Sequence, residues 1–556
     1  MNDVTMTRSA FRTWFERLFP DTQPAELGDF TATRRMLPLC LLAVFIGMLS
    51  GVVAKLLLSL IALFTNLFFF HRFSIELVTP STNTLGPLLL LVPTAGGLII
   101  GFMARYGSEK IRGHGIPEAL ESILMRGSRV EPKLAILKPT SAAISIGSGG
   151  PFGAEGPIIM TGGAFGSLIA QSFHLTAAER KTLLVAGATA GMAATFASPL
   201  AAMMLGVELL LFEWKPRSFV PVALACASAM AMRQFLMEPG PLFPVTLHAP
   251  ILTVKPLFGA VGAGIGAGLL SAAMTYSVYF FEDGFLKYAK KIHWMWWPAM
   301  AGLVIGLGGL ICPRALGVGY DVIGDLLNDR MTTTETLVLV AVKWGIWSFA
   351  LGSGTSGGVL APLLMLGAGL GSLEAKVLPD CGPGFWPLIG MGAILGGTMR
   401  APFTGILFAM EITHDWNLLL PLAVAVTVAH AFTVLVLRRS ILTEKVARRG
   451  YHLSREYAID PLEVLFVREV MRPPTEELHE GGPVAYTDET LKMITYRMAE
   501  HKVYRLVVLD REDGTKEGIV ALEDVLAARR RHLEEETRRE RPLRFTMLLA
   551  PFRRAS

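Results

Sequence analysis

Long apolar stretches separated by short polar segments dominate the chain from residue 36 to residue 437. A helix needs about 20 apolar residues to cross the hydrocarbon of a bilayer, and only some of the runs reach that length. Many runs are interrupted by glycine and proline. The pattern predicts an all-α polytopic membrane protein in which some helices are broken or tilted. The runs lie at about 36–70, 86–106, 134–149, 157–173, 182–213, 219–237, 256–281, 295–312, 334–350, 358–378, 385–410 and 417–437.

The apolar region contains an internal repeat. The stretch GSGGPFGAEGPIIMTGGAFGSL (147–168) is matched by GSGTSGGVLAPLLMLGAGLGSL (352–373), and SPLAAMMLGVE (198–208) is matched by APFTGILFAME (401–411). Both pairs are separated by about 204 residues, and repeated hydrophobic halves are typical of transport proteins whose site lies between the halves. We expect two repeats, at about 36–237 and 256–450.

Composition supports a membrane protein. Charged residues make up 17% of the chain, hydrophobic residues 52%, and the mean hydropathy is +0.48, whereas a soluble domain carries about 25% charged residues. This composition excludes a disordered chain, a disulfide scaffold and an ordinary cytosolic enzyme. The net charge of +5 is explained by basic residues that flank membrane spans, so we expect no nucleic-acid partner.

The uneven distribution of charge predicts the domain organisation. Charged residues become frequent after the last apolar run, where Arg438 and Arg439 follow directly. Basic residues at a membrane exit stay on the cytoplasmic side, so we expect a cytoplasmic C-terminal region and an inner-membrane location. Residues 1–35 mix acids and bases without the apolar core of a secretory signal, and we expect a cytoplasmic N-terminal segment. The predicted parts are 1–35, a membrane domain at 36–450, a linker at 451–465, a soluble domain at 466–530 and a charged tail at 531–556.

The repeated blocks predict an anion site. In each block a glycine-rich stretch leads to a proline, Pro157 or Pro362, and then to an apolar helix, and RGHGIPEALE (112–121) has the same order. We place these prolines at the first helical position, where a missing N–H costs nothing. A helix that begins inside the membrane leaves its first N–H groups unpaired, and together with the helix dipole they can hold an anion.

Glu155 is the predicted gate. It lies at the end of the first glycine-rich stretch, where an ionised carboxylate would occupy the anion site and a protonated or displaced one would leave it open. The structural alternative is an acid that simply favours a helix N-terminus. An ionisable residue deep in an apolar region favours the functional interpretation.

Three segments resemble the anion-pathway signatures of the CLC chloride channel and transporter family. They are GHGIPE (113–118), GAEGP (153–157) and GGVLAP (357–362), and MRAPFTGILFAMEIT (399–413) resembles a further family stretch. The resemblance implies an inverted-repeat fold, a homodimer and one anion pathway in each subunit. It also implies transport of chloride or a similar small anion, as a channel or as an H+/Cl− exchanger. The anion contacts that it implies are His114, Gly115, Ala154, Glu155, Gly156, Val359, Leu360 and Leu442.

The chain departs from the family pattern at three positions. His114 stands where the family often has a serine, and Leu442 where many members have a tyrosine. His114 is either an anion contact or a structural histidine. Leu209 occupies the position of the second, proton-handling glutamate of many exchangers. This weakens proton coupling without excluding it, since Glu208 or Glu213 could carry the proton.

The soluble part, 466–530, resembles a single CBS motif, of the type that pairs to bind adenine nucleotides. The apolar run at 505–509, followed by the turn Asp513-Gly514, predicts paired strands. Asp524 matches the ribose-contacting aspartate, but Ala521 replaces an expected hydroxyl residue. An adenine nucleotide site and a purely structural dimer contact are both open, and no cofactor is required for transport.

Two other function classes remain as alternatives. Gly354-Thr355-Ser356-Gly357 has the form of the GxSG motif of intramembrane serine proteases, although a protease needs a histidine within hydrogen-bond reach of the serine. A magnesium or cation transporter with CBS regulation would need acidic pore residues, which the repeat blocks lack except for Glu155. We expect a transport protein without enzymatic activity and without a bound metal.

Overall fold

The computed structural model divides the chain into two compact units, Met1–Arg455 and Glu456–Ser556. It describes residues 34–250, 254–448, 462, 465–474 and 482–537. The predicted N-terminal segment, linker and charged tail lie largely outside the described residues. The division between the units falls within the predicted linker.

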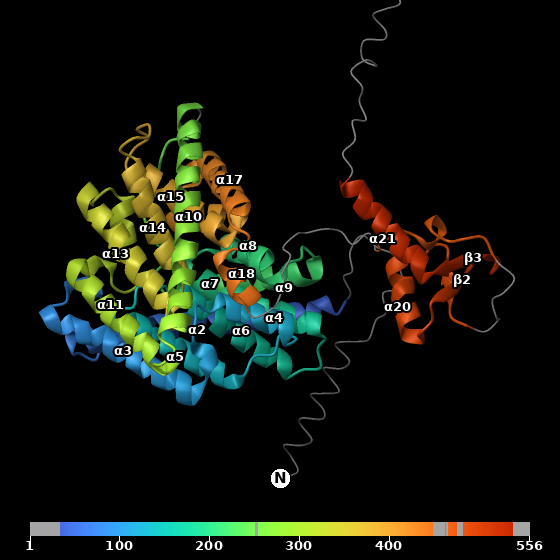
Figure 1. The fold of residues 1–556 in the computed structure, drawn as a ribbon, viewed down its shortest axis with the longest axis horizontal. Coiled ribbons are helices and arrows are strands. Elements are labelled where there is room, and N and C mark those ends of the chain that lie inside the picture. The colour runs from blue at the N-terminus through green and yellow to red at the C-terminus, as the bar shows by residue number, and fades with distance from the viewer. Residues whose placement is uncertain (1–33, 251–253, 449–461, 463–464, 475–481, 538–556) are drawn as a thin grey trace, which may run out of the picture. The chain divides into compact units, whose positions relative to one another are not determined.

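The larger unit is helical and consists of two halves (Figure 1). Its helices pack on one continuous apolar core drawn from both halves. The helices of the first half are α2 (Met36–Phe70), α3 (Leu91–Phe102), α4 (Ile116–Met125), α5 (Pro132–Gly147), α6 (Glu155–Gln171), α7 (Ala177–Phe196), α8 (Pro199–Leu205) and α9 (Pro216–Leu236). Those of the second half are α10 (Val254–Tyr288), α11 (Trp297–Ile311), α12 (Tyr320–Leu327), α13 (Thr333–Gly352), α14 (Leu360–Glu374), α15 (Phe385–Met399), α16 (Pro402–Thr413), α17 (Leu419–Val436) and α18 (Ile441–Arg448).

Helix lengths agree with the sequence pattern. Seven segments of the described chain are long and apolar enough to cross a membrane, whereas four other apolar helices are too short. Short helices must end at buried loops, because unpaired backbone groups cannot face lipid. The prediction of broken helices is therefore confirmed. The short apolar helices are Pro199–Leu211, Leu360–Glu374, Phe385–Met399 and Pro402–Thr413.

Several helices of the first half recur in the second half with the same packing partners. Both begin with a helix of 35 residues, α2 and α10, and the packing pairs α2–α9, α6–α7 and α2–α5 recur as α10–α17, α14–α15 and α10–α13. The second repeated sequence block forms α8 in one half and α16 in the other.

A reciprocal exchange of caps joins α8 and α16. The Glu208 carboxylate accepts the N–H groups of Phe403 and Thr404 at 3.1 and 2.8 Å, at the start of α16. The Glu411 carboxylate accepts the N–H groups of Leu200 and Ala201 at 2.9 and 2.8 Å, at the start of α8. Reciprocal contacts of this kind are the signature of a two-fold relation.

The described residues of the smaller unit form a three-stranded sheet with two α-helices. Strand β1 (Val484–Tyr486) pairs in parallel with β2 (Arg505–Leu509), which pairs antiparallel with β3 (Lys516–Ala521). Helices α20 (Leu491–His501) and α21 (Leu522–Thr537) complete it. The predicted pairing across the Asp513-Gly514 turn is confirmed, whereas β1 was not predicted. The unit has its own apolar core, which includes Ile494, Leu506, Val508 and Val520.

Candidate anion site

Three helices begin at one place in the larger unit. They are α4, α6 and α14, and each follows one of the three glycine-rich signatures. The N–H of Gly358 donates to the carbonyl of Gly153 at 3.0 Å, and the N–H of Gly357 donates to the carbonyl of Gly113 at 3.4 Å. The three loops are thus joined by backbone hydrogen bonds, although they are far apart in the sequence.

Glycine allows the three helix starts to approach this closely. A Cβ at Gly156 would lie 1.8 Å from the carbonyl oxygen of His114 and 3.2 Å from the Cα of Gly358. A Cβ at Gly115 would lie 2.2 Å from the carbonyl oxygen of Gly156, and Gly115 has a positive φ of 91°. Because any side chain at these two positions would push the helix starts apart, glycine is required for convergence.

The prolines are not where the sequence placed them. Helices α6 and α14 begin at Glu155 and Leu360, so Pro157 and Pro362 occupy the third helical position and not the first. A proline costs no hydrogen bond there either, because the first four N–H groups of a helix have no intrahelical partner. The correction places Glu155 itself in the first turn of α6.

The Glu155 side chain folds back into the space between the helix starts. It is fully buried, and neither carboxylate oxygen makes a well-formed hydrogen bond to the described residues. A Cβ at Gly153 would lie 1.7 Å from its Oε2, and the N–H of Ala361, in the first turn of α14, is close enough to act on it. The carboxylate therefore occupies the place that an anion would take at the N-terminus of α14.

Most of the predicted contacts lie together at this convergence. Val359 and Leu360 form the start of α14, Ala154 and Gly156 the start of α6, and each of the four is buried. His114 is 3% exposed and lies within electrostatic range of Glu118. The assigned roles of these residues in anion binding remain predictions.

Two buried lysines, one in each half, donate hydrogen bonds to backbone carbonyls of loops in the larger unit. Lys138 donates from Nζ to the carbonyls of Ile111 and Gly113, both at 2.8 Å. Lys343 donates to the carbonyls of Ala315 and Gly317 at 3.0 and 2.8 Å. Both side chains are buried, and each, when protonated, makes the potential around the site more favourable for an anion.

A lysine on α18 contacts the start of α4. Lys445 Nζ lies 2.9 Å from Oε1 of Glu118, and Oε2 of the same carboxylate accepts the Gly115 N–H at 2.7 Å. Helix α18 packs against α4 and carries Leu442, which is fully buried in its first turn. The apolar side chain at 442 therefore lies on the helix that packs against α4.

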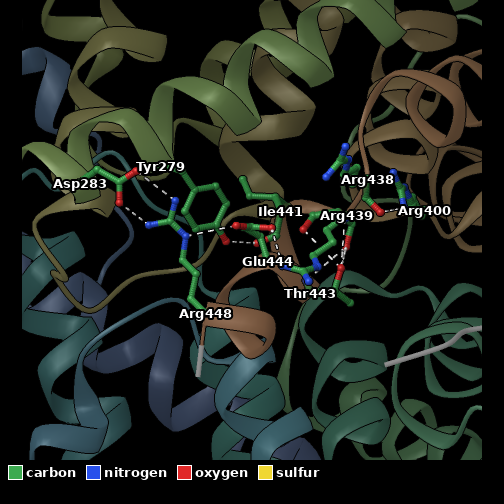
Figure 2. A network of polar contacts seen from close by, with 10 residues as sticks. Tyr279, Asp283, Arg400, Arg438, Arg439, Ile441, Thr443, Glu444 and Arg448 are labelled. Atoms are coloured by element: carbon green, nitrogen blue, oxygen red, sulfur yellow. Dashed lines mark hydrogen bonds and ion pairs between the residues drawn. The ribbon is translucent and has the colours of Figure 1, made fainter. Parts of the chain in front are cut away.

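A polar network holds α18 in place (Figure 2). The Tyr279 hydroxyl donates to the carbonyl of Ile441 at 2.5 Å. The Arg448 guanidinium binds Asp283 through both terminal nitrogens, at 2.5 and 3.1 Å, and Glu444 through Nε at 3.2 Å. It also lies 4.5 Å above the Tyr279 ring. These contacts bind both ends of α18 to α10, and the Arg448–Glu444 bond lies within α18. Together they fix the position of Leu442.

Two predicted residues of the larger unit, Glu208 and Glu213, lie apart from the helix starts. Both Glu208 oxygens are bound at the start of α16, and Glu213 forms ion pairs at 3.9 Å with Lys181 and Arg217. Asp524 belongs to the smaller unit. Ser356, the serine of the protease alternative, shares a hydrogen bond of 3.1 Å with the Ser141 hydroxyl and not with a histidine.

Sequence reasoning missed the cationic residues of this region. Lys138 and Lys343 interrupt two apolar runs and are separated by the same interval as the repeat blocks, so the repeat itself was the signal that could have found them. For the Lys445–Glu118 pair there was no such signal, because the partners are 327 residues apart.

Helix N-termini from two related halves, joined by backbone hydrogen bonds around a buried carboxylate, define a membrane protein built for anions. Comparison with known proteins agrees with this class. Residues 96–434 match the family described as voltage gated chloride channel, and the chain belongs to this family. The predicted inverted-repeat fold is thereby confirmed.

Individual relatives show the extent of the similarity. The H(+)/Cl(−) exchange transporter ClcA of Vibrio cholerae serotype O1 is 31% identical over 381 residues, which cover 64% of this chain and 79% of the relative. The putative chloride channel protein ClcB-like of Ralstonia nicotianae is 27% identical over 351 residues, which cover 60% and 80%. The crystal structure of a slow cyanobacterial Cl−/H+ antiporter has a TM-score of 0.66 at 20% identity, covering 74% of this chain and 97% of that one.

Proposed function

We propose that this protein moves chloride, or a similar small anion, across the membrane between the starts of α4, α6 and α14. The observation that carries the proposal is the Glu155 carboxylate, which lies buried at the N-terminus of α14 without a well-formed hydrogen bond among the described residues. A group held there by helix N–H groups and nearby cationic charge imitates a bound anion. The relatives with chloride in their names support this choice of anion.

Glu155 acts as the gate of this pathway. When it is ionised and folded inward, it competes with the anion for the same N–H groups. When it is protonated, it loses the attraction of the helix dipole and the site opens. Anion flux should therefore rise as the pH falls, and Glu155→Gln should transport with little dependence on pH. A Glu155→Gln protein with the pH dependence of the wild type would refute the gate.

Two transport mechanisms are compatible with this proposal: channel conduction and H+/Cl− exchange. Both use Glu155, and exchange also needs a second proton carrier. Leu209 cannot carry a proton, and both oxygens of Glu208 are bound at the start of α16. A proton path through Glu208 would therefore have to break that cap, whereas Glu213 lies at a partly exposed surface.

Reversal potentials of the purified protein in liposomes test the function and separate the two modes. Opposed chloride and pH gradients are imposed, and the voltage of zero current is measured. Dependence on the chloride gradient alone indicates a channel, and an added shift with the pH gradient indicates exchange. Chloride flux no greater than that of protein-free liposomes would refute the proposed function.

The proposals for orientation, assembly and location rest on the sequence and on the resemblance. Arg400, Arg438 and Arg439 lie near one another beside α18 (Figure 2), and basic residues that follow a membrane span favour the cytoplasmic side. We propose a homodimer in the cell (inner) membrane with both terminal regions cytoplasmic. Protease access to the soluble unit in sealed, inside-out vesicles tests the orientation.

For the smaller unit we propose a structural role as a CBS-like contact between subunits. Arg472 donates from Nε to Asp524 Oδ1 at 2.6 Å, and this bond raises the pKa of Arg472 above its ordinary value. The other oxygen of Asp524 accepts the N–H of Ala521 at 2.9 Å. Both oxygens are thus used within the unit, and a nucleotide ribose would have to displace Arg472.

A further inference from the structure

The first half of the protein has a signature loop at 113–118. The second half has a structural counterpart of this loop, which lies outside the repeated sequence blocks. Lys138 holds the carbonyls of Ile111 and Gly113 in the first half. Lys343 holds those of Ala315 and Gly317 in the second. The segment 315–320 is therefore the counterpart of 111–116, which contains an anion-pathway signature.

Inversion of the halves places the counterpart loop at the opposite end of the pathway. The 113–118 loop lies beside α18, since Lys445 contacts Glu118. The counterpart loop lies against the glycine-rich stretch that leads to Glu155, because the Gly317 N–H donates to the carbonyl of Gly149 at 3.1 Å. The first helical residue after this loop is Tyr320, where the first half has Ile116.

The Tyr320 ring packs against two aromatic neighbours. Its ring is 6.3 Å from that of Phe196 and 6.0 Å from that of Phe243, both in edge-to-face geometry. The hydroxyl oxygen is buried and has no hydrogen-bond partner among the described residues. A buried hydroxyl without a partner is costly, which indicates that a ligand or a moving group completes it.

The Glu155 carboxylate is a candidate partner for the Tyr320 hydroxyl. Tyr320 lies within electrostatic range of the Glu155 carboxylate, whose oxygens also lack a well-formed hydrogen bond among the described residues. A buried donor and a buried acceptor thus lie near each other without being bonded. The positions at which the family often offers hydroxyls are His114 and Leu442 in this chain.

We propose that Tyr320 supplies a hydroxyl donor to the anion pathway on the side away from α18. Its O–H binds the passing anion and, when the carboxylate swings toward it, Glu155. The inference rests on the proposed function and adds a binding residue to it. A hydroxyl hydrogen bond to an ion is stronger than one between neutral groups, so its loss should be measurable.

Tyr320→Phe is the direct test because it removes only the hydroxyl and keeps the ring between Phe196 and Phe243. Chloride affinity is measured by titration calorimetry of the purified protein, in the wild-type and Glu155→Ala backgrounds. Tyr276→Phe, at an exposed tyrosine of α10, is the matched control. Thermal melting of each variant checks that the fold is intact.

We expect Tyr320→Phe to weaken chloride binding about tenfold in the Glu155→Ala background, where no carboxylate competes, and Tyr276→Phe to leave it unchanged. Unchanged affinity of Tyr320→Phe in the Glu155→Ala background overturns the assignment, whatever happens in the wild-type background. Failure of the proposed function is distinct, since the wild-type protein would then neither bind nor transport chloride.

Discussion

The Lys445–Glu118 pair gives a sharp test of how α18 is coupled to the anion site. Lys445 Nζ lies 2.9 Å from Glu118 Oε1, and the side chains are 18% and 7% exposed. Lys445→Met removes the ammonium group and leaves the Glu118 carboxylate buried. Among the described residues, the Gly115 N–H then remains as its hydrogen-bond donor. The variant therefore creates an incompletely compensated buried charge beside the start of α4.

The size of the effect follows from this geometry. Breaking a fully buried ion pair by removing one partner costs about 3–5 kcal/mol. Here Lys445 is partly exposed, Glu118 keeps the Gly115 N–H, and Lys138 remains within electrostatic range of it. We therefore expect Lys445→Met to lower the free energy of unfolding by about 2 kcal/mol.

Reversible unfolding in mixed detergent micelles measures this quantity for four proteins: the wild type, Lys445→Met, Glu118→Gln and the double variant. Glutamine at 118 keeps an acceptor for the Gly115 N–H but carries no charge. The double variant should therefore be more stable than Lys445→Met alone. Lys290→Met, at an exposed lysine, is the matched control.

Two results would refute this reasoning. One is a Lys445→Met protein as stable as Lys290→Met. The other is a double variant whose loss equals the sum of the two single losses, because independent sites add whereas partners in one pair do not.

Further predictions concern the close approach of the helix starts, the two reciprocal caps and the smaller unit. Gly156→Ala places a Cβ 1.8 Å from the His114 carbonyl oxygen, so chloride flux should fall at least tenfold while the protein still inserts; normal flux would contradict the packing of the helix starts. Glu208→Gln and Glu411→Gln each weaken one cap of the two-fold pair, and each should cost about 1 kcal/mol of unfolding free energy; a loss confined to one variant would contradict the reciprocal arrangement. Because both Asp524 oxygens are bound within the smaller unit, ATP should leave the melting temperature of the full-length protein unchanged, and a clear rise would favour the nucleotide alternative.

The sequence predicted those features that arise from local pattern or from the repeat. The apolar runs predicted the helical membrane unit, and the two matched blocks predicted the relation between the halves. Glycine-proline signatures predicted where α4, α6 and α14 begin, within two residues. Each of these features depends on residues close together in the chain or on a second copy of the same segment.

Other features could not be read from local sequence because they join distant segments. The cap that Glu411 makes on Leu200 spans 211 residues, and the Lys445–Glu118 pair spans 327. The proximity of Tyr320 to Glu155, which lie within electrostatic range of each other, likewise depends on how the two halves pack. Parallel pairing of β1 with β2 was also missed, because a strand of three residues carries too little alternation to be recognised.

The central claim is that the starts of α4, α6 and α14 hold an anion, and anomalous diffraction from crystals grown in bromide tests it most directly. Bromide resembles chloride in charge and scatters anomalously. With Glu155→Gln protein, the account predicts an anomalous peak within contact of the backbone N–H groups of Gly156 and Leu360. Anomalous peaks confined to the protein surface, with none between the three helix starts, would contradict it.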